Sequence, residues 1–345
     1  MKNRFALVDD PLFTEHRARE PHPERPERLV ACRAAVAQAE LSAERSELTP
    51  RDATEEELAR VHGGSYLEAL GHADGSSGYF DGDTYYGPKS VAVARRAAGG
   101  AIALVEALAA GEARFGAALL RPPGHHARPD TAMGFCILNN VAVAAAHARA
   151  SGADRVAIVD WDVHHGNGTQ EMFYADPSVL YVSLHQFPFY PGTGAAHEIG
   201  RGDARGKTVN VPLSGGASDA VYVAAFDRLI APILSQFDPD LVLVSAGFDA
   251  HRRDPLASMA LSEEGYAAMA RRIARALPRG AAGRIGLVLE GGYDLEGLRS
   301  SLQRALEALD SDEAEEPRAE TKLGPLHEAE LDRALSAQKP FWKLD

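Results

Sequence analysis

Four short apolar segments constrain the fold of this chain most strongly, because each of them runs directly into a polar motif. Such runs, rich in β-branched residues and bounded by charge or glycine, are typical of buried strands. The four runs occupy residues 117–120, 156–159, 241–248 and 285–289. Ala-rich amphipathic segments lie between them, and this alternation is typical of a doubly wound, mainly parallel sheet. Ligands bind at the carboxyl ends of the strands in such sheets, so we expect the four polar motifs to meet in one crevice.

The amphipathic segments predict six helices and a chain in two parts. The expected helices span residues 26–39, 89–109, 139–150, 219–235, 262–276 and 295–309. With 345 residues and 45% hydrophobic content, the chain can fill one large α/β domain, which we place at residues 1–309. In the remainder, 310–345, the acidic residues 310–316 predict a solvated linker or helix end, and residues 323–345 a tail with one short helix. We expect Pro340-Phe341-Trp342 in this tail to dock on the body or on a second subunit, which leaves a homo-oligomer open.

Composition narrows the class of protein. The only cysteines, Cys32 and Cys136, argue against a disulfide framework and favour a reduced, cytoplasmic setting. We see no signal peptide and no apolar run long enough to cross a bilayer, so we expect no membrane partner. The net charge of −13 argues against direct nucleic-acid binding and mildly favours cationic substrates.

The motif after residues 156–159 has the chemistry of a metal site. Alternate side chains of an extended segment share a face, so Asp160, Asp162 and His164 would project together. Carboxylates with an imidazole suit zinc or another divalent first-row metal, and a site with few protein ligands leaves room for water and substrate. Asp249, at the end of the next apolar run, becomes the third ligand if the strand ends meet. His165 should point to the opposite face and have a structural role, and His185 should lie in a second layer. His251, two residues after Asp249, could join the metal, but its loop position favours a surface or support role.

Seven motifs in order along the chain resemble a known family. They are Arg121-Pro-Pro-Gly-His-His126, Gly134-Phe-Cys-Ile-Leu-Asn-Asn140, the segment 160–169, Ser183-Leu-His185, Pro191-Gly-Thr-Gly194, Ser245-Ala-Gly-Phe-Asp249 and Glu290-Gly-Gly-Tyr293. Together they resemble the zinc-dependent histone deacetylases of the class II type, which include bacterial deacetylase-like amidohydrolases and acetylpolyamine amidohydrolases. The resemblance covers residues 4–306 and implies an arginase/deacetylase-like fold with about eight strands.

The resemblance implies a role for each residue of the site. It implies one zinc ion per chain on Asp162, His164 and Asp249. It also implies a histidine pair at His125 and His126, an orienting carboxylate at Asp160, and a catalytic tyrosine at Tyr293. Asn167 stands where some relatives carry a second orienting carboxylate, so the imidazolium form of His126 should be less stabilised here. We expect His126 to activate water and Tyr293 to donate to the oxyanion.

Further positions follow from the resemblance alone. A potassium or sodium ion would lie on backbone oxygens of Asp160, Asp162, His164, Ser183 and Leu184. A second monovalent ion would lie near Phe173, Asp176, Val179 and Lys207. The substrate channel would be lined by Gly134, Phe135, Phe189, Tyr190, Leu256 and Gly292, with Asp83 at its rim. The loop from His22 to Arg28 would lie near the mouth, where Arg25 is structural or lies by an acetate exit.

The expected reaction is hydrolysis of the acetyl amide of acetyl-lysine or a similar N-acetylated amine. An acetylpolyamine, another acyl amide or an acyl ester would suit the same chemistry. An arginase-like hydrolase with two metals would need more aspartate ligands, and Asn167 and the His125-His126 pair argue against it. A non-catalytic acyl-lysine binding module is the remaining alternative.

Overall fold

A single sheet of eight parallel strands forms the centre of the molecule, in the order β2-β1-β5-β10-β9-β6-β7-β8. The computed structural model describes residues 4–277, 284–311 and 323–344. The strands are β1 (Arg4–Val8), β2 (Glu44–Leu48), β5 (Phe115–Ala118), β6 (Val156–Asp160), β7 (Val179–Gln186), β8 (Thr208–Leu213), β9 (Leu241–Ala246) and β10 (Ile285–Leu289). Two further strands, β3 (Gly78–Tyr79) and β4 (Tyr85–Tyr86), form a small antiparallel ladder. The predicted parallel α/β fold is therefore confirmed.

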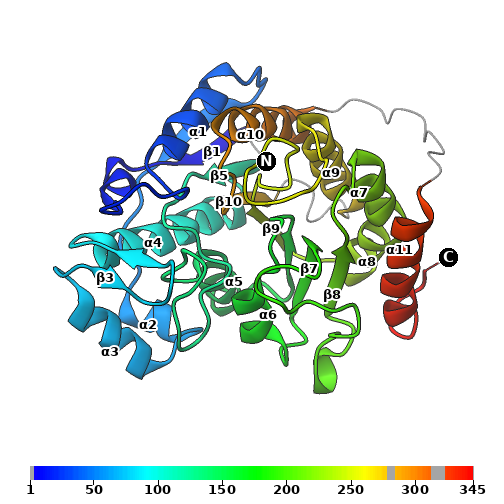
Figure 1. The fold of residues 1–345 in the computed structure, drawn as a ribbon, viewed down its shortest axis with the longest axis horizontal. Helices are drawn as coiled ribbons and strands as arrows, with labels where there is room; N and C mark the ends of the chain where they lie inside the picture. The colour runs from blue at the N-terminus through cyan, green and yellow to red at the C-terminus, as the bar shows by residue number, and fades with distance from the viewer. Residues whose placement is uncertain (1–3, 278–283, 312–322, 345) are drawn as a thin grey trace.

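Helices cover both faces of the sheet (Figure 1). They are α1 (Glu27–Gln38), α2 (Glu55–Ala59), α3 (Gly64–Ala73), α4 (Ser90–Ala109), α5 (Asn140–Ala150), α6 (Asn167–Phe173), α7 (Asp219–Ala225), α8 (Ala231–Phe237), α9 (Glu263–Ala276), α10 (Leu295–Asp310) and α11 (Pro325–Gln338). The short 3₁₀ segments are η1 (Pro11–Glu15) and η2 (Gly202–Ala204). One layer contains α4 and α5, which pack on each other and on the central strands, while α1, α10, α9 and α7 pack side by side in another.

The six helices predicted from the sequence are present, and one of them is interrupted. Between α7 and α8 the chain forms a π-helical turn, η3 (Phe226–Ile230), which the apolar pattern does not reveal. The whole stretch Asp219–Phe237 is long and apolar enough to cross a membrane by length and composition, so the expectation of no such segment was wrong on that measure. Half of its most apolar part is buried within the fold, as in the core helix of a globular protein, so it is weak evidence for a membrane segment.

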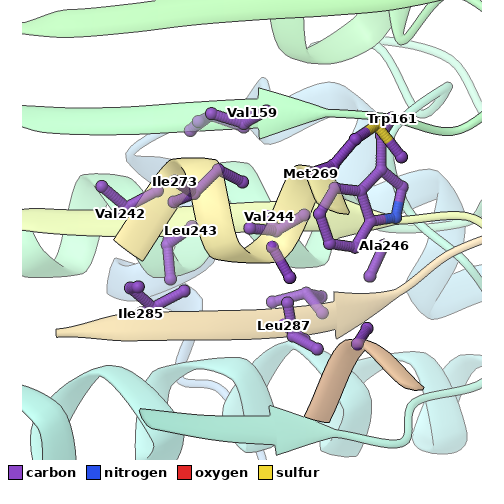
Figure 2. Close-up of a cluster of buried hydrophobic side chains, with 14 of the residues drawn as sticks. Val159, Trp161, Val242, Leu243, Val244, Ala246, Met269, Ile273, Ile285 and Leu287 are labelled. Atoms are coloured by element: carbon purple, nitrogen blue, oxygen red, sulfur yellow. The ribbon is translucent and has the colours of Figure 1, made fainter. Parts of the chain in front are cut away.

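An apolar layer of buried side chains fills the space between the sheet and α9 (Figure 2). Met269 and Ile273 on α9 lie against apolar side chains of β9 and β10. Trp161, the first residue after β6, is fully buried, with its ring 6.0 Å from that of Tyr266. Because Trp161 lies between Asp160 and Asp162, its burial fixes the backbone that carries both carboxylates. Truncation of a buried tryptophan typically costs about 3–5 kcal/mol.

The C-terminal segment covers the open edge of the sheet at β8. Gln338 Nε2 donates to the Thr208 carbonyl at 2.8 Å, and Trp342 Nε1 donates to the Gly206 carbonyl at 2.9 Å. The Lys207 ammonium lies 4.2 Å from the centre of the Trp342 ring. Helix α11 therefore protects an edge strand from pairing with other chains. Of the acidic segment 310–316, Asp310 ends α10 and residues 312–316 lie outside the described residues.

Candidate metal centre and active site

Asp162, His164 and Asp249 come together at the carboxyl ends of β6 and β9. One donor atom from each residue lies within 4.8 Å of the others, and the two carboxylates are buried. His164 Nδ1 lies 3.2 Å from Asp162 Oδ1 and 3.2 Å from Asp249 Oδ2. Among the residues that the structure describes, this is the one cluster of three such groups that could hold a metal ion.

Backbone donors aim the two carboxylates at this point. Gly291 N donates to Asp162 Oδ2 at 2.8 Å, and Val163 N donates to Asp249 Oδ1 at 2.9 Å. The other oxygen of each carboxylate is thereby turned towards His164 Nδ1. Three segments that are distant in sequence thus fix the donor geometry before any ion binds, as a preorganised site requires.

The electrostatics of the cluster favour a positive charge between the donors. Burial opposes the charged form of His164, but hydrogen bonds and charge from Asp162 and Asp249 raise its pKa to about 10. Burial and then the nearby Asp162 charge raise the pKa of Asp249. Two carboxylates and one imidazole around an open position are a donor set that suits zinc. The residues present therefore fit a divalent metal.

The histidine pair lies beside this cluster, and its two members differ in charge. The ring centres of His125 and His126 are 4.0 Å apart. His125 Nδ1 lies 3.0 Å from Asp160 Oδ2. Burial lowers the pKa of His125, but the Asp162, Asp160 and Glu290 carboxylates outweigh burial and raise it well above its usual value. His125 is therefore held as the imidazolium.

His126 is held neutral. Burial, followed by the positive charges of His125 and His164, holds the pKa of His126 well below its usual value. Its Nδ1 lies 2.8 Å from Asn167 Oδ1, whose amide is oriented by donation from Nδ2 to Met133 Sδ at 3.4 Å. An amide oxygen can only accept, so the proton of neutral His126 is on Nδ1 and its Nε2 carries a lone pair. That nitrogen can accept a proton at neutral pH.

Glu290 holds the segment that carries the pair, a role that the sequence analysis missed. Its Oε2 accepts from Gly124 N at 2.6 Å and from His125 N at 3.1 Å. Burial raises the pKa of Glu290 to about 7. The signal in the sequence is a charged residue directly after an apolar strand.

Tyr293 follows β10 and faces the same region. Its side chain is 9% exposed, and its ring lies edge-on to Phe135 with the centres 5.9 Å apart. The Arg28 guanidinium lies 5.0 Å from the centre of the Tyr293 ring. Arg28 Nε donates to the Gly292 carbonyl at 2.7 Å, and Arg28 also donates to the Glu290 carbonyl. The buried arginine behind Tyr293 is thus Arg28, which the sequence analysis did not single out.

Arg25, the arginine expected near the mouth, is exposed. It lines an outer cavity of about 670 Å³ that reaches Tyr293 and is walled by Pro255 and by the loop from Arg17 to Glu27. Whether Arg25 has a structural role or lies by an acetate exit stays a prediction. The cavity touches none of the three residues of the metal cluster.

Aromatic rings surround the histidines on the solvent side. The Phe189 ring stacks on His164 at 5.5 Å, and the Tyr190 ring lies edge-on to His126 at 5.1 Å. Gly134 has φ +57°, and a Cβ there would lie 2.5 Å from His126 Cδ2, so a side chain would displace the imidazole. The predicted channel residues Gly134, Phe135, Phe189 and Tyr190 therefore lie together around the site.

Of the remaining predicted channel and rim residues, Asp83 and Leu256 are partly or largely exposed, whereas Gly292 is buried. Asp83 is exposed, and its carbonyl lies 3.3 Å from His22 Nε2. Burial, followed by the Asp81 charge, raises the pKa of Asp83. Leu256 is half-buried, and its N donates to Asp254 Oδ1 at 3.0 Å. Gly292 has φ +118° and lies directly before Tyr293.

The predicted monovalent-ion positions remain predictions. Asp160 pairs with Ser183 in the β6–β7 register, which places the first group (Asp160, Asp162, His164, Ser183 and Leu184) around two adjacent strand ends. In the second group, three carbonyls accept backbone hydrogen bonds: that of Phe173 from Asp176 N, that of Asp176 from Val179 N, and that of Lys207 from Tyr181 N.

The other histidines belong to supporting layers. His165 points away from the metal cluster, with Nδ1 2.8 Å from Thr193 Oγ1 and Nε2 2.9 Å from Gln170 Oε1. His185 lies between Ser183 Oγ and the Gly194 carbonyl, at 2.9 Å from each. His251 contacts Glu263 at 3.3 Å.

Comparison with known proteins places these features in context. A family model described as "Histone deacetylase domain" matches residues 22–309. Histone deacetylase 15 of Arabidopsis thaliana is 44% identical over 94% of this chain and 59% of its own length. Human polyamine deacetylase HDAC10 is 42% identical over 93% of this chain and 49% of its own length, so the chain spans only about half to three fifths of these relatives. The crystal structure of the HDA15 HD domain superposes with a TM-score of 0.91 at 40% identity, covering 98% of this chain and 97% of that chain.

Proposed function

Since the chain belongs to the histone deacetylase family, we propose that it is a zinc-dependent amidohydrolase that removes the acetyl group from acetyl-lysine in polypeptides. The observation that carries this proposal is the convergence of Asp162, His164 and Asp249 within 4.8 Å, beside a histidine whose pKa is held low. These three residues would hold the zinc ion. When bound, zinc would polarise the acetyl carbonyl and lower the pKa of a water molecule.

Each residue of the pair has its own task in the proposed reaction. His126 Nε2 takes the proton from the attacking water, since Asn167 holds the other ring nitrogen as a donor. The same nitrogen then returns a proton to the leaving amine. His125, whose pKa the Asp162 and Asp160 carboxylates raise, stabilises the negative charge that develops as the water attacks. The Tyr293 hydroxyl donates to the oxygen that becomes an oxyanion.

The walls of the site suit a linear alkyl amine. Phe189 and Tyr190 lie against the site histidines and Phe135 lies edge-on to Tyr293, so the methylenes of a lysine side chain would be buried against aromatic rings at about 0.8 kcal/mol per CH₂. We place the polypeptide that flanks acetyl-lysine in the outer cavity of about 670 Å³ that reaches Tyr293, although none of the metal-cluster residues lines that cavity.

An N-acetylated polyamine is the second candidate substrate. It is favoured by the Asp81 and Asp83 carboxylates at the rim, which would attract a distal ammonium group. The human relative named a polyamine deacetylase points the same way. Both candidates carry the same acetyl amide on an alkyl chain, so the same reaction applies to both. They differ in the group at the other end of that chain, which is a polypeptide in one and an ammonium group in the other.

The test compares kcat/KM for an acetyl-lysine peptide and an N-acetylated diamine, with zinc supplied. We expect the peptide to be preferred at least about tenfold, which corresponds to about 1.4 kcal/mol. The reverse preference would favour the polyamine, and absence of turnover of both would overturn the proposed function.

Tyr293→Phe tests the mechanism in the same assay. We expect it to lower kcat by about 10²–10³-fold, because an oxyanion donor is removed, with zinc content unchanged. Tyr174→Phe, on a half-buried tyrosine at the end of α6, is the matched control and should keep wild-type turnover. Near-normal activity of Tyr293→Phe would contradict the role of the hydroxyl.

A further inference from the structure

We propose that Asp254 is a positioning residue that sets the place of the catalytic Tyr293 hydroxyl and joins it to the rim of the site; this inference rests on the proposed function. Asp254 lies in the loop after β9, five residues beyond Asp249, and is 7% exposed. No motif of the sequence analysis includes it. Its carboxylate bridges two loops that meet at the mouth of the site.

Within the described part of the chain, the Asp254 carboxylate accepts its hydrogen bonds from three backbone N–H groups. Oδ2 accepts from Tyr293 N at 2.6 Å and from Asp294 N at 3.2 Å. Oδ1 accepts from Leu256 N at 3.0 Å. The carboxylate therefore ties the loop that carries Leu256 to the peptide that carries Tyr293.

Tyr293 needs such a tie because its backbone has left the sheet. Strand β10 ends at Leu289, and Gly292 has φ +118°, a conformation that glycine adopts without a steric penalty. Before Tyr293, Arg28 holds the Gly292 carbonyl at 2.7 Å. After it, Asp294 caps α10 by accepting from Gly297 N at 2.7 Å. The bond from Tyr293 N to Asp254 fixes the residue itself, and thus the direction in which its side chain leaves the backbone.

The chemistry of the contact requires a carboxylate. Three N–H groups converge on two oxygens that can only accept. Asparagine has nearly the same shape but one acceptor, so its NH₂ group would face either Leu256 N or the Tyr293 and Asp294 donors. One side of the bridge is then lost, and Tyr293 or the rim loop shifts. A misplacement of about 1 Å can cost about 10²-fold in rate.

A double-mutant cycle tests whether Asp254 acts through the Tyr293 hydroxyl. We expect Asp254→Asn to lower kcat by about 10–100-fold with zinc content unchanged. In a Tyr293→Phe background the same change should cost less than about twofold, because coupled residues are non-additive. An equal loss in both backgrounds would overturn the proposal.

Asp219→Asn is the matched control. Asp219, on α7, also bridges two segments, accepting from Ser262 N at 2.7 Å and from the Ser262 hydroxyl at 2.5 Å, but these bonds involve neither Tyr293 nor a residue of the metal cluster. We expect it to lower stability without changing kcat. If Asp254→Asn does not fold, Asp254→Glu enters the same cycle; it keeps the acceptors, moves them by one methylene, and should show the same non-additivity.

A readout that does not need turnover separates this inference from the proposed function. With tyrosines replaced by 3-fluorotyrosine, the ¹⁹F resonance of Tyr293 is identified by its loss in Tyr293→Phe. We expect that resonance to shift or broaden in Asp254→Asn and to stay in place in Asp219→Asn. An unchanged Tyr293 resonance in Asp254→Asn would overturn the positioning role, whereas a shifted resonance in a protein without deacetylase activity would overturn only the proposed function.

Discussion

Glu24→Gln should destabilise the fold by about 3–5 kcal/mol, because it leaves two buried arginines without their shared carboxylate. Glu24, Arg28 and Arg121 are each fully buried. Glu24 Oε2 accepts from Arg121 Nη2 at 2.7 Å, Oε1 accepts from Arg121 Nε at 2.5 Å, and Oε1 also accepts from Arg28 Nη1 at 3.3 Å. Burial alone would raise the pKa of Glu24, but Arg121 and the other neighbouring charges hold it far below its usual value.

The size of the destabilisation follows from the single acceptor oxygen of glutamine. At least one guanidinium donor would face an NH₂ group, which costs about 1–3 kcal/mol for an unsatisfied buried group. The remainder of the roughly 3–5 kcal/mol comes from the buried arginine charge that glutamine does not neutralise. Urea unfolding of both proteins measures the difference in the free energy of unfolding. The control is Glu15→Gln, whose partner Lys89 lies 3.1 Å away on the surface, and it should cost less than about 1 kcal/mol. A loss below about 1 kcal/mol for Glu24→Gln would refute the reasoning.

Three further predictions address pH, metal and the tail. Burial lowers the pKa of His62 to about 4, and its Nε2 accepts from Asn139 N at 3.0 Å. In the unfolded chain His62 has a pKa of about 6.5 and takes up a proton before the folded protein does, so the free energy of unfolding should fall as pH falls from about 6.5 to 4. Urea unfolding at several pH values measures this dependence. His62→Gln should reduce the slope of the free energy of unfolding against pH by up to about 1.4 kcal/mol per pH unit. Zinc at about 100 times its Kd should raise the free energy of unfolding by about 2.7 kcal/mol, and calorimetry should show no such gain in Asp249→Ala. Trp342→Ala should cost about 2 kcal/mol in urea unfolding, since it removes the hydrogen bond to Gly206 and the contact with Lys207; an unchanged midpoint would show that the tail does not stabilise the body.

The part of the site that could be predicted from the sequence is the part set by strand geometry. Asp162, His164 and Asp249 each follow an apolar run, and parallel strands bring their carboxyl ends to one edge. The six long helices were also predictable, because their apolar periodicity is local, whereas the shorter α2, α3 and α6 were not predicted. The π-helical turn at Phe226–Ile230 was not, since its apolar pattern matches that of an uninterrupted helix.

The residues that the sequence analysis missed act through long-range backbone contacts. Arg28 holds the carbonyl of Gly292, which is 264 positions away in the chain, and Asp254 accepts from Tyr293 N, which is 39 positions away. Arg25 and Arg28 look alike in the sequence, and only burial on the first turn of α1 distinguishes them. Backbone carbonyl and N–H groups are nearly the same in every residue, so the sequence does not indicate which side chain binds them.

The most direct test of the central claim is a zinc titration of acetate release from an acetyl-lysine peptide by the metal-free protein. Because one cluster of three donors would hold one zinc ion, we expect the rate of acetate release to rise linearly with added zinc and to level off at one zinc per chain. A plateau at two zinc ions per chain, or no acetate release at any zinc concentration, would contradict a mononuclear deacetylase.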